Sequence, residues 1–143
     1  MIGKGIVLIF LAAGTVWDLK KKTLPENYVI LFGVVAMLYL VFQIISGKSI
    51  SEGVLGLIPG VVSLILCLIT KEQIGLGDGL LLLFVGCFQN MKETLGILFA
   101  AFAILLIVSM FLLFTGQVGR KSTIPFVPFL FCGQFLLIVG GFL

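Results

Sequence analysis

The sequence predicts an all-α polytopic membrane protein with about six transmembrane helices. Of its 143 residues, 61% are hydrophobic and 10% are charged, whereas an ordinary soluble domain is about half apolar and a quarter charged. The mean hydropathy is +1.34, and nearly the whole length divides into apolar runs that approach the roughly 20 residues needed for one bilayer span. No stretch is left for a soluble domain, so we expect a single transmembrane domain over residues 1–143.

Short polar breaks divide the chain into six apolar segments: residues 2–17, 28–45, 54–70, 79–90, 94–115 and 124–142. Each is expected to be a helix, because a chain in lipid must satisfy its backbone hydrogen bonds within the segment. The first segment lacks an Ala-x-Ala-like cleavage site and is followed by further spans, so it is interpreted as a helix rather than a signal peptide. Gly56 and Gly60 lie on one face of the third segment, a spacing that permits close helix approach. The fourth is short, which favours a start below the membrane surface.

The basic residues fall into two sets, which occupy alternate polar breaks of the chain. One set comprises Lys20, Lys21, Lys22, Lys71, Arg120 and Lys121, and the other comprises Lys4, Lys48 and Lys92. Because cytoplasmic loops carry the excess of Lys and Arg, the first set is predicted to be cytoplasmic and the N-terminus external. The charges are scattered rather than gathered in a stripe, so the net charge of +3 does not indicate a nucleic-acid partner. We expect a multi-pass protein of the cytoplasmic membrane, in contact with lipid.

Histidine is absent from the chain, which excludes Ser-His-Asp and Cys-His catalysis and any His-ligated metal. Cys67, Cys87 and Cys132 lie inside apolar runs and form no Cys-x-x-Cys pair, so they indicate neither a disulfide framework nor a zinc site. They are interpreted as small helix-packing residues. We therefore expect no metal and no cofactor.

Two of the six acidic residues, Asp18 and Asp78, directly adjoin apolar runs, and both fall at the predicted cytoplasmic ends of helices. An ionisable group at such a position is costly, by about 2.5–3.5 kcal/mol at mid-helix and less near the ends. In one interpretation each faces water at a helix end, with Asp78 as an N-cap. In the other the two form a pair, because Gly75, Gly77 and Gly79 allow close helix approach and unusual backbone torsions.

A pair of neighbouring carboxyl groups would explain catalysis in a chain without His. Two such groups cannot both ionise, so they share a proton. The ionised member can take a proton from water while the protonated member polarises the carbonyl of an amide. The paired interpretation therefore predicts amide hydrolysis at Asp18 and Asp78.

Three motifs in order resemble the type IV prepilin peptidase family. Gly75-Leu76-Gly77-Asp78 is similar to the GxGD motif. The segment from Asp18 to Glu26, with Pro25 seven residues after the aspartate, is similar to the other aspartate segment of that family. Ile124–Leu130, with Pro125 and Pro128, resembles the opening of the last helix. The similarity is greatest to the small peptidase-only members of Flp-type (tight-adherence) pilus systems, because the Cys-rich insert of the bifunctional enzymes is absent; N-methyltransferase activity is not expected.

The resemblance implies an intramembrane aspartic endopeptidase whose catalytic pair is Asp18 and Asp78. Its substrates would be prepilins or pseudopilins, cut after a short basic leader at the cytoplasmic face. Two positions depart from the family: Leu80 stands where Lys is usual, and Glu26 where Asn or Asp is usual. A presenilin-like or signal-peptide-peptidase-like GxGD protease and a non-catalytic membrane subunit remain alternatives, and Leu80 favours the latter. The sequence leaves homo-oligomerisation open.

Overall fold

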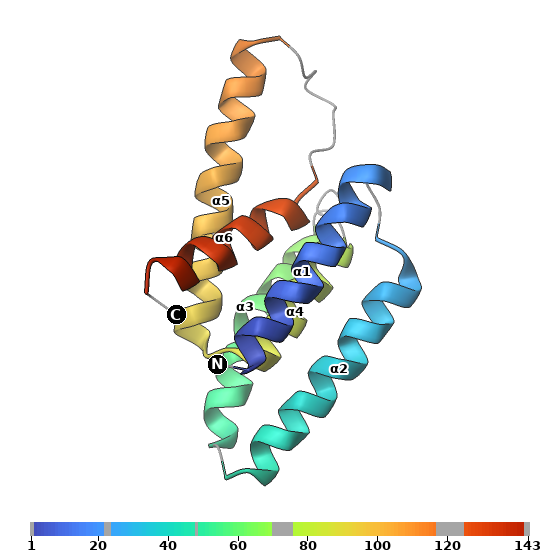
Figure 1. The fold of residues 1–143 in the computed structure, drawn as a ribbon, viewed down its shortest axis with the longest axis vertical. Helices are drawn as coiled ribbons and strands as arrows, with labels where there is room; N and C mark the ends of the chain where they lie inside the picture. The colour runs from blue at the N-terminus through green and yellow to red at the C-terminus, as the bar shows by residue number, and fades with distance from the viewer. Residues whose placement is uncertain (1, 22–23, 48, 70–75, 117–124, 142–143) are drawn as a thin grey trace.

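The computed structural model describes residues 2–21, 24–47, 49–69, 76–116 and 125–141, and within these ranges the chain forms six α-helices and no strand (Figure 1). The helices are α1 (Ile2–Lys21), α2 (Glu26–Ile45), α3 (Ile50–Ile69), α4 (Leu76–Phe88), α5 (Met91–Phe114) and α6 (Val127–Val139). The all-α class predicted from the sequence is confirmed. By length and composition, α1, α2 and α5 are able to cross a membrane, whereas the apolar parts of α3, α4 and α6 are shorter.

Every expected segment coincides with a helix, but the ends differ. The first helix continues past residue 17 through Asp18 to Lys21, and the last covers Val127–Val139 rather than 124–142. Helical hydrogen bonding continues through polar residues at the end of an apolar run, so hydropathy locates the apolar part of a helix rather than its ends. Glu26 and Glu93, which the sequence places in polar breaks, lie in the first turns of α2 and α5.

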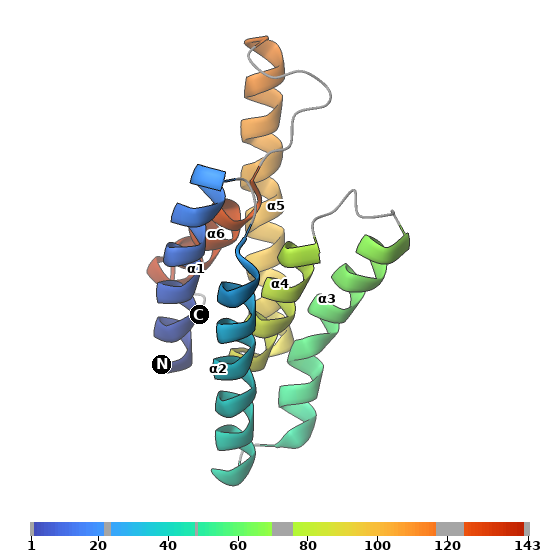
Figure 2. The ribbon, with the colours of Figure 1, turned by 90° about the vertical axis from the view of Figure 1, so that its right-hand side faces the viewer.

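Helix α4 lies at the centre of the bundle and contacts α1, α2, α3 and α5 (Figures 1 and 2). Its 13 residues are short for a span, and most of them beyond the first turn are buried. On one side of α4, helix α6 packs against both α1 and α5. The C-terminal part of α5 extends beyond its neighbours (Figure 2).

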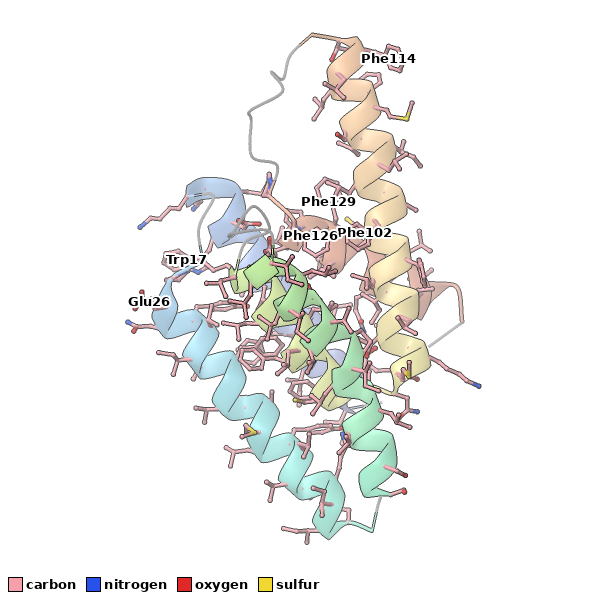
Figure 3. All side chains as sticks on the ribbon, turned by 180° about the vertical axis from the view of Figure 1, so that it is seen from behind. Trp17, Glu26, Phe102, Phe114, Phe126 and Phe129 are labelled. Carbon is pink, nitrogen blue, oxygen red and sulfur yellow. The ribbon has the colours of Figure 1, made fainter. Side chains whose placement is uncertain are left out.

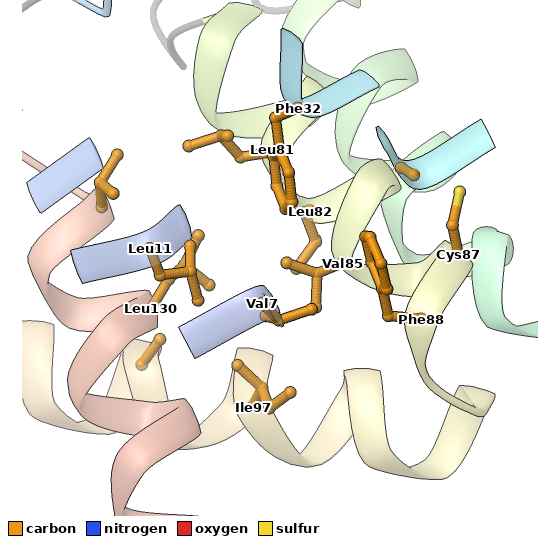
Figure 4. Close-up of a cluster of buried hydrophobic side chains, with 13 residues drawn as sticks. Val7, Leu11, Phe32, Leu81, Leu82, Val85, Cys87, Phe88, Ile97 and Leu130 are labelled. Carbon is orange, nitrogen blue, oxygen red and sulfur yellow. The ribbon is translucent and has the colours of Figure 1, made fainter. Parts of the chain in front are cut away.

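The core is a cluster of apolar side chains around α4 (Figure 4). Val7 and Leu11 of α1, Leu130 of α6 and Ile97 of α5 are at most 1% exposed. On the α2 side, the ring of Phe32 stacks on Phe10 with centroids 4.6 Å apart. The buried core therefore joins four helices, α1, α2, α5 and α6, around α4, which carries Asp78.

The outer surface is also apolar. Phe102 is 51% exposed and Phe114 is 84% exposed, both on α5 (Figure 3). Burial of such side chains against one another would be expected in water. Their exposure along a long helix is typical of a surface that faces lipid.

Glycines form the contact between α3 and α4, as the spacing of Gly56 and Gly60 predicts. A methyl group added to Gly56 would collide with the carbonyl oxygens of Gly86 and Gln89, and one added to Gly60 would collide with the backbone of Leu83. The two backbones touch because no side chain separates them.

Candidate active site

Asp18 belongs to the buried face of α1. The buried residues of this helix are Gly3, Val7, Leu11, Gly14 and Asp18, which recur at helical spacing along one stripe. Asp18 lies near the C-terminal end of α1, the end that the sequence predicts to be cytoplasmic, yet it is only 6% exposed. The interpretation of Asp18 as a helix-end residue facing water is therefore wrong.

The first turn of α6 covers Asp18. The backbone N–H of Val127 donates to Oδ2 of Asp18 over 3.2 Å. A methyl group on Gly14, one turn before Asp18, would lie 3.3 Å from Cγ1 of Val127, so Gly14 allows the close approach of the two helices. N–H groups at a helix N-terminus lack partners within the helix and readily bind a carboxylate. Asp18 thus joins α1 to the start of α6.

Local sequence makes the N–H of Val127 available to Asp18. Pro128, the second residue of α6, has no N–H to offer. The N–H of Phe129 donates within the turn to the carbonyl oxygen of Phe126 over 3.0 Å. The turn is held against α5 by the rings of Phe126 and Phe102, whose centroids are 5.5 Å apart. Among residues 127–129, only Val127 therefore has a backbone N–H that donates to a side chain of another helix.

Asp78 lies in the first turn of α4 and is half-buried. It follows Leu76 and Gly77 within the helix, so it is not the N-cap that one interpretation predicts. Its helix contacts α1, and its carboxyl group lies within electrostatic range of that of Asp18. The two carboxyl groups that the sequence singles out therefore lie in the same region of the bundle.

The glycines beside Asp78 act through packing rather than through unusual torsions. Gly77 and Gly79 are helical, and neither has a positive φ, contrary to the expectation of special torsions. A methyl group at Gly79 would lie 2.9 Å from Cδ2 of Leu64, which confirms close approach to α3. One at Gly77 would lie 3.4 Å from Cδ1 of Leu24, so the start of α4 reaches the segment after α1. Gly75 lies outside the described residues.

The three prolines of the motifs lie at helix starts. Pro25 is the N-cap of α2, and its carbonyl oxygen accepts the N–H of Tyr28 over 2.9 Å. Pro128 is in the first turn of α6, as expected, and Pro125 directly precedes the N-cap Phe126. Among the basic residues, Lys20 and Lys21 are exposed in the last turn of α1. Lys22, Lys71, Arg120 and Lys121 lie outside the described residues.

Other polar groups come together at the opposite end of the bundle. Lys4 forms an ion pair with Glu93, with Nζ and Oε1 2.9 Å apart. Nε2 of Gln89 donates to Oε1 of Gln134 over 2.8 Å in a buried contact. The charge pattern of the sequence does not single out the glutamines, because an amide is not ionisable, although an amide inside an apolar run is also costly. In the described part of the chain, no three His, Cys, Asp or Glu side chains form a cluster able to hold a metal ion.

The comparisons with known proteins give one match. Residues 5–110 match the model of the type IV leader peptidase family. This range includes both aspartates and covers more than half of the chain, but it ends before Pro125 and Pro128. No curated protein and no solved structure matches the chain.

Proposed function

Because the chain belongs to the type IV leader peptidase family, we propose that it is an aspartic endopeptidase whose catalytic pair is Asp18 and Asp78. The observation that carries this proposal is the juxtaposition of two carboxyl groups, one on α1 and the other on α4, within reach of each other's charge. Family membership alone supports a peptidase. The pairing of the two aspartates supports the aspartic type.

The chemistry needs one proton shared between two carboxyl groups. The ionised carboxylate takes a proton from a water molecule, which then attacks the carbonyl carbon of the scissile peptide bond. The protonated carboxyl donates a hydrogen bond to the carbonyl oxygen, where negative charge develops. The apolar surroundings strengthen both interactions, because the local dielectric is low. The carboxyl group that took the proton from water then passes it to the amide nitrogen, the C–N bond breaks, and the products are the new amine and the new carboxylic acid.

The proposed substrate is a prepilin or pseudopilin with a short basic leader followed by an apolar helix, as for the small peptidase-only members of Flp-type systems. We propose that all six helices lie in the cytoplasmic membrane, with the N-terminus external and the aspartates at the cytoplasmic end. The charge pattern of the sequence supports this orientation. A leader that remains in the cytoplasm would then meet the aspartate pair directly.

Cleavage of a prepilin-like substrate in membranes tests the proposal. Wild type, Asp18→Asn and Asp78→Asn are compared at matched expression, with Glu26→Gln as the control. Each asparagine variant should lose activity by about four orders of magnitude or more, because amide side chains cannot exchange the proton. Glu26→Gln should retain it, because Glu26 is an exposed carboxylate at the start of α2 (Figure 3).

The contrary outcomes are distinct. Cleavage by either asparagine variant at the wild-type rate would exclude that residue from the catalytic pair. An inert wild type, folded and tested on several basic leaders, would favour the non-catalytic membrane subunit. In that case the first substitution to make is Leu80→Lys, which introduces the cation usual in the family. Recovery of cleavage would show that Leu80 causes the loss of activity.

A further inference from the structure

Two glutamine side chains are buried at the far end of α4. Gln89, which directly follows the helix, is 3% exposed, and Gln134 in the middle of α6 is 0% exposed. One hydrogen bond joins them, from Nε2 of Gln89 to Oε1 of Gln134. Oε1 of Gln89 and Nε2 of Gln134 have no partner in the described part of the chain.

This glutamine pair is expected to stabilise the fold less than two apolar side chains would. A buried amide with unsatisfied hydrogen-bonding groups is unfavourable, and polar contacts between helices in a membrane contribute little on average. Two apolar side chains of similar length would fill the same space without unsatisfied atoms. Departures from the rules of packing are expected where function requires a particular geometry.

Helix α6 links this pair to Asp18. Val127, Leu130 and Gln134 are buried at spacings of three and four residues, so they share the inward face of α6. At the start of this face the N–H of Val127 holds Asp18. About two turns later, Gln134 holds Gln89. One face of one helix therefore contacts both α1, at Asp18 itself, and Gln89, the residue that directly follows α4.

The far end of α4 is the point from which Asp78 can be positioned. A helix is stiff along its axis, so fixing Gln89 limits the sliding of the whole helix and of Asp78 in its first turn. A directional hydrogen bond at Gln89 adds to the packing of α3 against α4, where Gly56, Gly60 and Gly86 bring the two backbones together.

We propose that Gln89 and Gln134 are positioning residues, which set the location of Asp78 relative to Asp18 through α6. This inference rests on the proposed function for its effect on cleavage. It also makes a statement about geometry that does not depend on cleavage. Both statements are tested with the full-length protein in membranes.

The kinetic test uses Gln134→Leu, Gln89→Leu and the double variant. Each single variant should lower kcat by about 10- to 100-fold with little change in KM, because a displacement of about 1 Å has an effect of this size. The double variant should be no slower than either single one, because all three remove the same bond. Gln43→Leu is the comparison variant: its Nε2 bonds the carbonyl oxygen of Cys87, near the same end of α4, from α2 over 3.3 Å. It should lower kcat less than Gln134→Leu, because it leaves the link from α4 through α6 to Asp18 in place.

The geometric test measures the approach of the start of α4 to the segment after α1, and it leaves Asp18, Asp78 and the bond to Val127 in place. Leu24→Cys and Gly77→Cys, whose Cβ atoms would lie 3.9 Å apart, are combined in a background in which Cys67, Cys87 and Cys132 are alanine, and the rate of disulfide formation is followed. Adding Gln134→Leu should slow this reaction, and adding Gln43→Leu should slow it less. Thermal unfolding is measured in parallel, and Gln134→Met replaces any leucine variant that fails to fold.

The two proposals fail separately. If the folded Gln134 variants retain both kcat and the rate of disulfide formation, the positioning role is wrong while the peptidase stands. If wild type cuts no leader but disulfide formation still depends on Gln134, the positioning role stands and the peptidase does not. Strictly additive losses in the double variant would also overturn the positioning role, since they exclude a shared bond.

Discussion

Gly60 illustrates how a single residue sets the distance between two helices. The backbone of Leu83 in α4 lies directly against it, where any other residue would place a Cβ atom. Gly53, in the same helix, faces open space, and a Cβ atom added there would meet nothing within 4 Å. The two glycines therefore have the same helix propensity and opposite packing environments.

Gly60→Ala should destabilise the protein by about 1–3 kcal/mol, because the added methyl group forces α3 and α4 apart. Gly53→Ala should be neutral or stabilising by up to about 1 kcal/mol, because alanine is the better helix former. Thermal or denaturant unfolding in detergent checks both. Equal effects of the two substitutions would contradict the glycine contact between α3 and α4.

Asp18 shows how far reasoning from single residues extends. The sequence identifies it correctly as unusual, because a carboxyl group beside an apolar run is costly, and it pairs it with Asp78. It cannot identify the N–H of Val127 as a partner, since that donor is a backbone group 109 residues away. The residue type at position 127 does not predict this bond, because every residue except proline has the same backbone N–H. The burial of Asp18 beneath α6 cannot be predicted from the sequence for the same reason.

At the scale of elements, the six helices are predictable and their ends are not. Apolar runs identify the helices because lipid-facing and core-facing residues are both apolar in this chain. Their ends depend on local bonds: α5 begins at Met91, where the N–H of Asn90 donates to Oε2 of Glu93 over 3.3 Å. The sequence places this start at residue 94, where uninterrupted apolar sequence begins. The contact partners of each helix are likewise set by tertiary packing.

Glu93 supports two elements at once, because its other carboxylate oxygen pairs with Lys4 of α1. Glu93→Ala should therefore destabilise the protein by about 1 kcal/mol, through loss of the cap of α5 and of the α1–α5 ion pair. Lys92→Ala is the control: Lys92 is exposed, and the change should remain within about 0.5 kcal/mol. Unfolding midpoints in detergent give both values. A loss for Lys92→Ala as large as for Glu93→Ala would show that charge alone matters.

For the whole molecule, the ends of the helices fall into two groups. The turn between α2 and α3, that between α4 and α5, and the N-terminus lie toward one end of the bundle, whereas the C-terminus of α1 and the N-terminus of α4 lie toward the other (Figures 1 and 2). The ion pair of Lys4 and Glu93 belongs to the first end. The carboxyl groups of Asp18 and Asp78 belong to the second. These helix ends alternate between the two ends of the bundle, as the breaks in the sequence predict, and labelling from outside the cell determines which end faces the cytoplasm.

Helix α2 allows that measurement with two variants of one element. Glu26 and Ser46 are exposed at its opposite ends, and each is changed to Cys in a background in which the three native cysteines are alanine. If the end with the aspartates is cytoplasmic, a membrane-impermeant maleimide should label Ser46→Cys in intact cells and Glu26→Cys only after permeabilisation.

The reverse labelling would place Asp18 and Asp78 outside the cytoplasm, where a leader that has not crossed the membrane is inaccessible. Labelling of both positions in intact cells would mean that α2 does not span the membrane at all. The expected result would connect the orientation with the chemistry, because the preference that keeps a basic leader on the cytoplasmic side would also keep Lys20 and Lys21 there. Enzyme and substrate would then be oriented by one physical rule, and the scissile bond would arrive at the depth of the two carboxyl groups without crossing the bilayer.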